Sequence, residues 1–246
     1  MGRIEIDINC DVGEGMGNEE KLFPFISSCN IACGGHAGDS NTMDEVVQLA
    51  IKNDIKIGAH PSYPDKANFG RISLNIPLLE LQESIKKQIN SLILVLKKNK
   101  APLHHIKPHG ALYNDIAMNL EMATVFLEAI EQYKEDVYLY VPYNSVIEEL
   151  AKENGYKIKR EAFGDRNYNA DLGLVSRSLP NALITSPKDV MKHLLHMIKN
   201  QNIKTSDGEI VEIYADTYCI HGDTPNALKI LMYLSVELSK LNIYIK

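Results

Sequence analysis

The chain has 246 residues, of which 45% are hydrophobic and 24% charged. These values are typical of a globular protein that can bury a substantial core, and the length suits one large α/β domain or two small ones. The net charge of -6 argues against nucleic acid or an anionic membrane surface as the main partner.

Membrane insertion and export are not expected either. No segment reaches the ~18 consecutive apolar residues of a membrane helix, and the first residues lack the apolar stretch of a signal peptide. The four cysteines, Cys10, Cys29, Cys33 and Cys219, show no C-x-x-C spacing and are expected to be reduced thiols. The sequence therefore predicts a cytoplasmic protein that binds neither nucleic acid nor membranes.

Residues 3–9 alternate between isoleucines and polar side chains, which predicts a strand. If this strand belongs to a closed barrel, Asp7 and Asn9 point into the interior, where polar groups need partners or a function. The glycine-rich segment that follows, residues 11–17, does not match G-x-x-x-x-G-K-[ST], so we do not interpret it as a phosphate-binding loop.

Residues 28–39 lead from a short apolar run into two glycines, then His36 and Asp39. Glycine allows the backbone to turn sharply or approach a ligand, and His and Asp are common proton-transfer groups and metal ligands. The alternative is a tight strand-to-helix turn with solvated polar residues. The functional interpretation is favoured because similar patterns recur along the chain.

Strands and helices alternate through the rest of the sequence. Strands are expected at residues 56–60, 104–110, 137–141, 157–163, 216–220 and 243–245. Helices are expected at 42–53, after Pro77, at 115–133, at 144–154, after Ser186 and after Thr224. This order predicts parallel strands with helices outside, in one domain over residues 1–246.

Polar side chains occur near the carboxyl ends of nearly all these strands. His60 ends one strand, His105, Lys107 and His109 share one side of another, and the remaining examples are Asp165, Arg166, His221 and Asp223. This distribution favours an irregular (β/α) barrel of about seven parallel strands, whose active face lies at those ends, over an open sheet with one switch point. His193 and His196, in a helix, are expected to be solvated, His104 structural, and Arg71 and Arg177 either carboxylate-binding or solvated.

Five segments carry a resemblance to a known family. They are Ile-Asp-Ile-Asn-Cys-Asp-Val-Gly-Glu (6–14), Asn-Ile-Ala-Cys-Gly-Gly-His-Ala-Gly-Asp (30–39), Gly-Ala-His-Pro-Ser-Tyr-Pro-Asp (58–65), Lys-Pro-His-Gly-Ala-Leu-Tyr-Asn (107–114) and Cys-Ile-His-Gly-Asp-Thr-Pro (219–225). The sequence resembles the family of 5-oxoprolinase A subunits, also called LamB/YcsF. The resemblance implies a barrel related to the glycoside hydrolase/deacetylase superfamily. It also implies ATP-dependent opening of 5-oxoproline to L-glutamate, with ATP as cofactor and the B and C subunits of 5-oxoprolinase as partners.

The residues suit that chemistry. A lactam amide is resonance-stabilised, so phosphorylation of its carbonyl oxygen would make it a better electrophile. This needs cations, a base and oxyanion donors. The catalytic candidates are Asp7, Asp11, His36, Lys107 and His109, and the candidates for binding substrate or phosphate are Asn9, Asp39, His60, Arg166, His221 and Asp223. For Lys107 the alternative is a structural ion pair with a carboxylate on a neighbouring strand.

A divalent metal is a further prediction, with Asp11, His36, His60 and His109 as candidate ligands for zinc or manganese. No local pair such as H-E-x-x-H fixes their geometry. Two other functions therefore stay open, a stand-alone metal-dependent hydrolase or deacetylase and a non-catalytic ligand-binding component of a multi-chain complex. The site of nucleotide binding cannot be read from the sequence.

Overall fold

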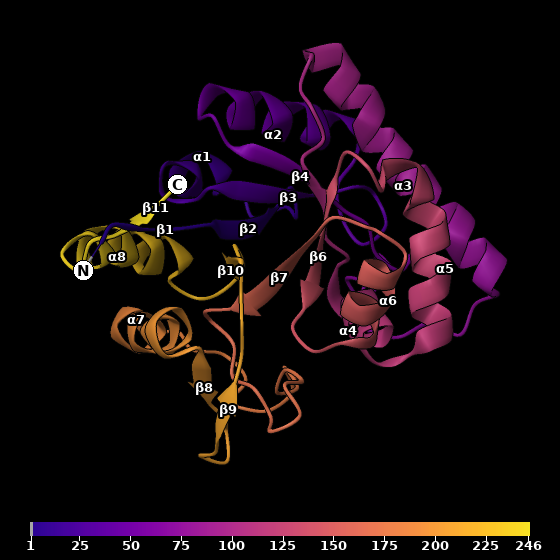
Figure 1. Ribbon diagram of the computed structural model, residues 1–246. Coiled ribbons are helices and arrows are strands. Elements are labelled where there is room, and N and C mark those ends of the chain that lie inside the picture. The colour runs from indigo at the N-terminus through magenta and orange to yellow at the C-terminus, as the bar shows by residue number, and fades with distance from the viewer. Residues whose placement is uncertain (1) are drawn as a thin grey trace.

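The computed structural model describes residues 2–246. Its centre is a closed barrel of seven parallel strands in the order β10-β2-β3-β4-β5-β6-β7 (Figure 1). These strands are β2 (Ile8–Val12), β3 (Ser28–Ala32), β4 (Lys56–His60), β5 (His105–Ile106), β6 (Tyr138–Pro142), β7 (Ile158–Phe163) and β10 (Thr217–Cys219). The prediction of an irregular barrel of about seven parallel strands is confirmed.

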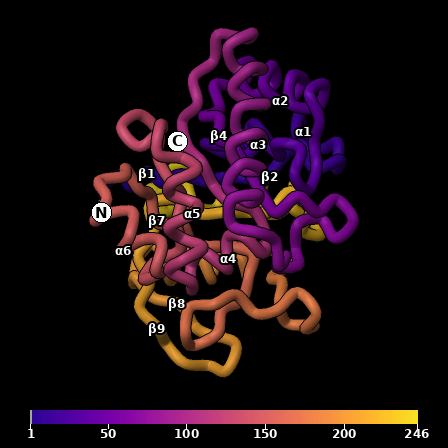
Figure 2. The backbone as a smooth tube through the Cα atoms, turned by 90° about the vertical axis from the view of Figure 1, so that its right-hand side faces the viewer, coloured from indigo at the N-terminus to yellow at the C-terminus, as the bar shows by residue number. Residues whose placement is uncertain are grey.

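Helices surround the barrel, with α2, α3 and α5 on one side and α7 and α8 on another (Figure 1). Figure 2 shows the side that α3 and α5 cover. Their bounds are α1 (Glu19–Leu22), α2 (Ser40–Lys52), α3 (Leu78–Asn99), α4 (Gly110–Met118), α5 (Leu120–Ile130), α6 (Val146–Glu153), α7 (Pro187–Leu195) and α8 (Ala227–Ser239). The longer helices turn an apolar face towards the strands, as shown by the buried Leu81, Ile85, Ile89, Leu92 and Leu96 of α3. None of the helices in residues 2–246 is long and apolar enough to cross a membrane.

Two smaller sheets lie outside the barrel. β1 (Ile4–Ile6) pairs in parallel with β11 (Ile243–Ile245), so the first and last strands lie side by side. The predicted strand at residues 3–9 is therefore two strands, of which only the second enters the barrel. β8 (Asn202–Lys204) and β9 (Ile210–Glu212) form an antiparallel hairpin that was not predicted from the sequence.

The barrel interior is polar, as the alternation at residues 3–9 predicted. The side-chain amide of Asn9 donates to Glu161 Oε1 and Thr217 Oγ1, both at 2.9 Å. Asn30 donates to Asn9 Oδ1 at 2.8 Å and Asp11 Oδ1 at 2.7 Å. These buried groups therefore supply most of one another's hydrogen-bond partners.

Three local predictions differ from the structure. The helix expected at residues 115–133 is two helices, since Asn119 is extended and accepts a hydrogen bond from the Met122 N–H to begin α5. The helix expected from residue 42 begins at Ser40, because Asp39 caps it. His193 is buried and close to Tyr168, so the prediction of a solvated histidine there was wrong.

Candidate active site

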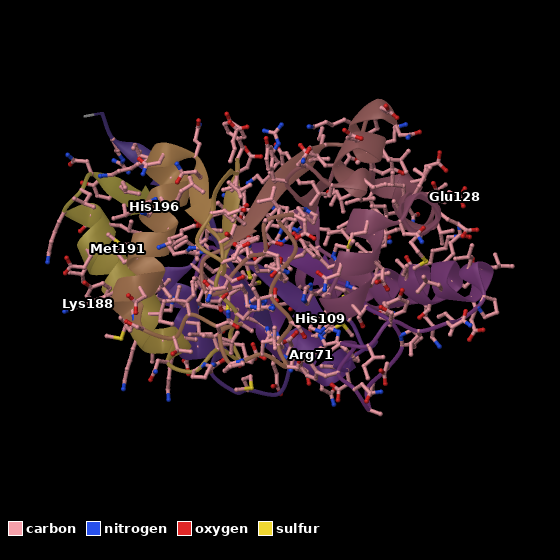
Figure 3. The ribbon with its side chains drawn as sticks, turned by 90° about the horizontal axis from the view of Figure 1, so that it is seen from below. Arg71, His109, Glu128, Lys188, Met191 and His196 are labelled. Atoms are coloured by element: carbon pink, nitrogen blue, oxygen red, sulfur yellow. The ribbon has the colours of Figure 1, made fainter. Side chains whose placement is uncertain are left out.

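A cavity of about 470 Å³ opens at the carboxyl ends of the barrel strands. Parallel strands direct the side chains that follow them to this one face. The charged and imidazole residues that line it are Asp11, Glu14, His60, Arg71, Lys107, His109, Arg166, Arg177, His221 and Asp223. Figure 3 shows Arg71 and His109 close together on this face, far from His196.

Three histidines and Glu14 converge beside this cavity. Glu14 Oε1 lies 2.9 Å from His36 Nε2 and 3.3 Å from His109 Nδ1. His60 Nε2 lies 3.0 Å from His109 Nδ1 and 3.4 Å from Asp11 Oδ2. The His36 and His109 rings stack with centroids 3.6 Å apart. Three of the predicted metal ligands, His36, His60 and His109, therefore converge with Glu14, whereas Asp11 contacts His60 but lies outside this group of ligand atoms.

Backbone carbonyls fix the protons on two of these rings. His60 Nδ1 is 2.7 Å from the Lys107 carbonyl oxygen, and His109 Nε2 is 3.0 Å from the Phe69 carbonyl oxygen. A carbonyl oxygen only accepts, so both nitrogens carry a proton. In neutral rings the two facing nitrogens, 3.0 Å apart, both hold lone pairs. Such an arrangement is stable only with a proton or a cation between them.

The geometry and chemistry of this cluster fit a divalent metal. The ligand atoms of Glu14, His36, His60 and His109 all lie within 4.8 Å of one another. Metal-binding histidines commonly donate their second N–H to a backbone carbonyl, as His60 and His109 do. Burial, followed by the neighbouring His36 and His60, lowers the pKa of His109 well below its usual value, which keeps this ring available as a neutral ligand.

Lys107 lies at the floor of the cavity, 2% exposed. Its Nζ is 2.9 Å from both Asp11 Oδ1 and Glu161 Oε1 and 3.2 Å from Cys219 Sγ. Burial alone would lower its pKa, but Asp11, Cys219 and Glu161 raise the pKa of Lys107 well above the usual value, so it stays charged. The structure thus contains the ion pair that was the alternative to an anion-binding role, but its carboxylates come from β2 and β7, which do not neighbour β5 in the barrel. The lysine also reaches the cavity.

Asp165 holds His221 in one orientation. The Asp165 carboxylate accepts from the His221 backbone N–H and ring Nδ1, both at 2.9 Å, and from the Thr224 hydroxyl. Burial opposes the charge on Asp165, but His221 and Thr224 outweigh this and lower the pKa of Asp165. Because Nδ1 donates, Nε2 of a neutral His221 carries the lone pair, and it lies 3.9 Å from Asp11 Oδ2. This is the arrangement of an oriented general base.

Arginines surround the outer part of the cavity. Arg71 Nη2 lies 2.5 Å and Arg177 Nη1 3.4 Å from the same oxygen of Asp223. Arg166 donates to the carbonyl oxygens of Val175 and Ala182, which anchors the loop that carries Arg177. Two guanidinium groups share one carboxylate, so the rim can accept a further anion.

Most of the predicted site residues come together here, either in the cavity wall or, like His36, in the cluster beside it. Two others lie deeper in the barrel. Asp7 contacts Ser28 and Thr217, with Lys56 and Lys159 nearby. Asn9 lies beneath Lys107, and its Oδ1 is 3.3 Å from Lys107 Nζ. Asn9 therefore supports the cavity floor directly, and Asp7 is linked to Asn9 through the Thr217 hydroxyl.

Asp39 lies apart from the cavity. It is exposed at the start of α2, where its Oδ1 accepts from the Thr42 N–H at 2.9 Å. Its role in this structure is that of a helix cap.

Glu14, Glu161 and Cys219 belong to this site but were not predicted from the sequence. Glu14 lies in a glycine-rich loop whose path cannot be read from the sequence. Glu161 was predictable in part, because a glutamate inside a buried strand needs a cationic partner.

Comparisons with known proteins agree with this architecture. The model of the LamB/YcsF family matches residues 6–246. The chain is 41% identical to the 5-oxoprolinase A subunit of Shouchella clausii, covering 98% of this chain and 97% of that protein. It is 37% identical to the 5-oxoprolinase A subunit of Pyrococcus horikoshii, covering 94% and 92%. A crystal structure of the lactam utilization protein from Thermus thermophilus matches with a TM-score of 0.91 and 33% identity over 99% of both chains. The chain therefore belongs to the LamB/YcsF family.

Proposed function

We propose that this chain is the A subunit of a cytoplasmic, ATP-dependent 5-oxoprolinase, which opens the lactam of 5-oxoproline to L-glutamate together with the B and C subunits. The proposal rests on the difference in side chains between the two ends of the cavity. Its inner end has converging imidazoles and carboxylates, and its outer end has arginines around a single aspartate. The proposed reaction is inferred from the relatives that are named 5-oxoprolinase A subunits.

The cavity suits a small ring with a carboxylate at one end and an amide at the other. Arg71 and Arg177 bind the carboxylate, with Asp223 keeping both guanidinium groups in place before substrate arrives. The lactam carbonyl then faces the inner end, near Lys107 and His221. Binding the ring at both ends fixes the position of the carbonyl relative to the base, and this orientation lowers the activation barrier.

The reaction proceeds by activation and then hydrolysis. The carbonyl oxygen takes the terminal phosphoryl group of ATP, ADP leaves, and the carbon becomes more electrophilic. His221, oriented by Asp165, removes a proton from the attacking water. Cleavage of the C–N bond in this water adduct opens the ring and leaves an acyl phosphate, and the ring nitrogen takes up a proton to become the amino group. A second water then hydrolyses the acyl phosphate to the side-chain carboxylate of glutamate and free phosphate. Lys107 and Arg166 stabilise the transferred phosphate through their positive charge.

A divalent metal, if bound, would be held by Glu14, His36, His60 and His109 and would supply Lewis acidity at the inner end of the cavity. Backbone carbonyl oxygens hold the rings of His60 and His109 in the orientation that this metal would need. Asp11 contacts both Lys107 and His60, so it connects this cluster with the cavity floor.

The proposal is tested by measuring glutamate release from 5-oxoproline by the chain with its two partners. ATP, a chelator and each partner are varied in turn. Loss of turnover without ATP, and after His221→Ala or Lys107→Ala, is the expected result. Full turnover without ATP would overturn the ATP-dependent reaction. Unchanged turnover in both variants would overturn the assigned residues.

The cluster of imidazoles and carboxylates also favours a second candidate, a stand-alone metal-dependent hydrolase. That function requires stoichiometric metal and turnover by the isolated chain without ATP. A non-catalytic component would instead bind 5-oxoproline with unchanged complex activity after His221→Ala. The same assay therefore separates all three functions.

A further inference from the structure

Asn30 lies on β3 inside the barrel, fully buried, and has no place in the proposed reaction. Its side-chain nitrogen donates to Asp11 Oδ1 at 2.7 Å and to Asn9 Oδ1 at 2.8 Å. Burial opposes the charge on Asp11, but the neighbouring His60 and Lys107 outweigh this and lower the pKa of Asp11 well below its usual value. An ionised carboxylate only accepts hydrogen bonds, so the nitrogen of Asn30 must face it. The Asn30 oxygen therefore points elsewhere and needs a donor of its own.

His105, on β5, is that donor. Its Nε2 lies 2.6 Å from Asn30 Oδ1. Burial, followed by the neighbouring His104 and Lys107, holds the pKa of His105 well below its usual value, so the ring is uncharged. A neutral imidazole has a single N–H, and the Asn30 oxygen places it on Nε2. Nδ1 then has the lone pair, and it faces His104 Nδ1 at 3.0 Å.

The register of the strands lets these two side chains meet across β4. Gly58 of β4 is paired with Asn30 on one side and with His105 on the other. A Cβ atom on Gly58 would lie 2.1 Å from His105 Nε2, so only glycine leaves room for the ring to reach Asn30. The Tyr140 ring stacks on His105 with centroids 4.0 Å apart. Packing and hydrogen bonds thus fix the His105 ring together.

The hydrogen bonds from His105 to Asn30 and from Asn30 to Asp11 determine how the Asp11 carboxylate is turned. Oδ1 accepts from Asn30 at 2.7 Å and from Lys107 Nζ at 2.9 Å. Oδ2 is left 3.4 Å from His60 Nε2 and 3.9 Å from His221 Nε2. A rotation of the carboxylate would change its distances to the lysine, to the histidine cluster and to the proposed base.

We propose that Asn30 and His105 are positioning residues that hold the Asp11 carboxylate in one orientation. In that orientation Oδ1 binds Lys107 and Oδ2 faces the two histidines. Neither Asn30 nor His105 lines the cavity, so both act through Asp11. The effect on kcat rests on the proposed function, while the arrangement of the side chains does not.

The first test compares two replacements of His105. Glutamine keeps an N–H group that can reach the Asn30 oxygen, whereas leucine removes the donor and keeps the apolar packing. In the assembled complex we expect His105→Leu to lower kcat for glutamate release about 10- to 100-fold. The KM for 5-oxoproline should not change, because the arginines that bind its carboxylate are not disturbed. His105→Gln should recover most of kcat.

Tyr140→Phe is the matched control. It keeps the ring that stacks on His105 and removes a hydroxyl whose contact is with Ser28 Oγ, away from Asn30. Its kcat should stay at the wild-type level. Equal kcat values in His105→Leu and His105→Gln would overturn the proposal, because a purely structural role would not distinguish them. A rise in KM without a fall in kcat would contradict it as well.

The second test needs no activity. Nitrogen NMR of the isotope-labelled chain shows which nitrogen of each imidazole carries the proton. We expect His105 to be protonated on Nε2 in the wild type, and the His60 ring signals to shift in His105→Leu but not in His105→Gln. A wild-type His105 protonated on Nδ1 would overturn the proposal even if neither variant folds. If the complex releases no glutamate, the proposed function fails, and the NMR result still decides this inference.

Discussion

In three imidazoles at the active-site cavity, a neighbouring acceptor holds the proton on one ring nitrogen. The other nitrogen of a neutral ring then has a lone pair. A backbone carbonyl fixes His60 and His109, whereas a carboxylate fixes His221. The first two rings therefore face each other with lone pairs, which suits a cation. The third directs its lone pair towards the cavity, which suits proton transfer. Histidines that look equivalent in the sequence thus have different chemistry.

Arg71 and Arg177 are expected to select lactams that carry a carboxylate. Replacing either by alanine removes charge-assisted hydrogen bonds worth about 1.5–3 kcal/mol. The KM for 5-oxoproline should therefore rise about 10- to 100-fold, while turnover of 2-pyrrolidinone by the complex should not change. Arg3→Ala is the control, since Arg3 pairs with Glu5 outside the barrel. An equal loss of activity towards 5-oxoproline and 2-pyrrolidinone would show that the arginines do not recognise the carboxylate.

Among the structural elements, the start of α2 shows why the sequence could not distinguish a helix cap from a site residue. Asp39 follows His36 by three residues, but the chain turns between them. His36 enters the cluster, whereas Asp39 remains at the surface as the helix cap. Ser, Thr, Asp and Asn are all common at helix starts, so a cap and a site residue look alike in the sequence.

Asp39→Ala should therefore affect stability and not chemistry. Loss of the hydrogen bond to the Thr42 N–H is expected to lower the melting temperature by about 2–4 °C. Kinetic constants for 5-oxoproline should stay at the wild-type level. Asp39→Ser, which can cap the helix, should recover most of the stability. A large fall in kcat with unchanged melting temperature would show that Asp39 acts in the reaction and not only as a helix cap.

α7 holds a histidine whose burial makes stability depend on pH. Burial lowers the pKa of His193 from 6.5 to about 4. Between these values the unfolded chain takes up a proton that the folded chain does not, so acidification favours unfolding by at most ~1.4 kcal/mol per pH unit.

The fall in unfolding free energy between pH 7 and pH 4.5 should consequently be smaller in His193→Gln than in the wild type. Urea unfolding at several pH values measures it. His196→Gln, at the end of the same helix, is the matched control. The same pH dependence of the unfolding free energy in His193→Gln and wild type would show that His193 does not cause it.

At the scale of the whole molecule, closure of the barrel brings together residues from distant parts of the chain. Lys107, which follows one strand, meets Asp11 and Glu161 from two others. Removing either carboxylate would leave a buried charge less well paired, which typically costs several kcal/mol. The barrel and the floor of its cavity therefore stabilise each other.

Metal binding should stabilise the whole fold if the histidine cluster holds a cation. A ligand that binds the folded state at 100 times its Kd adds about 2.7 kcal/mol. We expect Zn²⁺ to raise the melting temperature of chelator-treated protein, and His60→Ala to abolish this shift. His196→Ala, away from the cluster, should retain it. An identical shift in wild type and His60→Ala would exclude this cluster as the binding site.

The barrel, its polar interior and most of the residues that line the cavity could be predicted from the sequence. These follow from local rules, since alternation sets which side chains point inward and parallel strands end at one face. Which of these polar residues meet could be learned only from the folded chain. Glu14 and Glu161 join the site and Asp39 leaves it, because loop paths and inter-strand register are set by packing between distant segments.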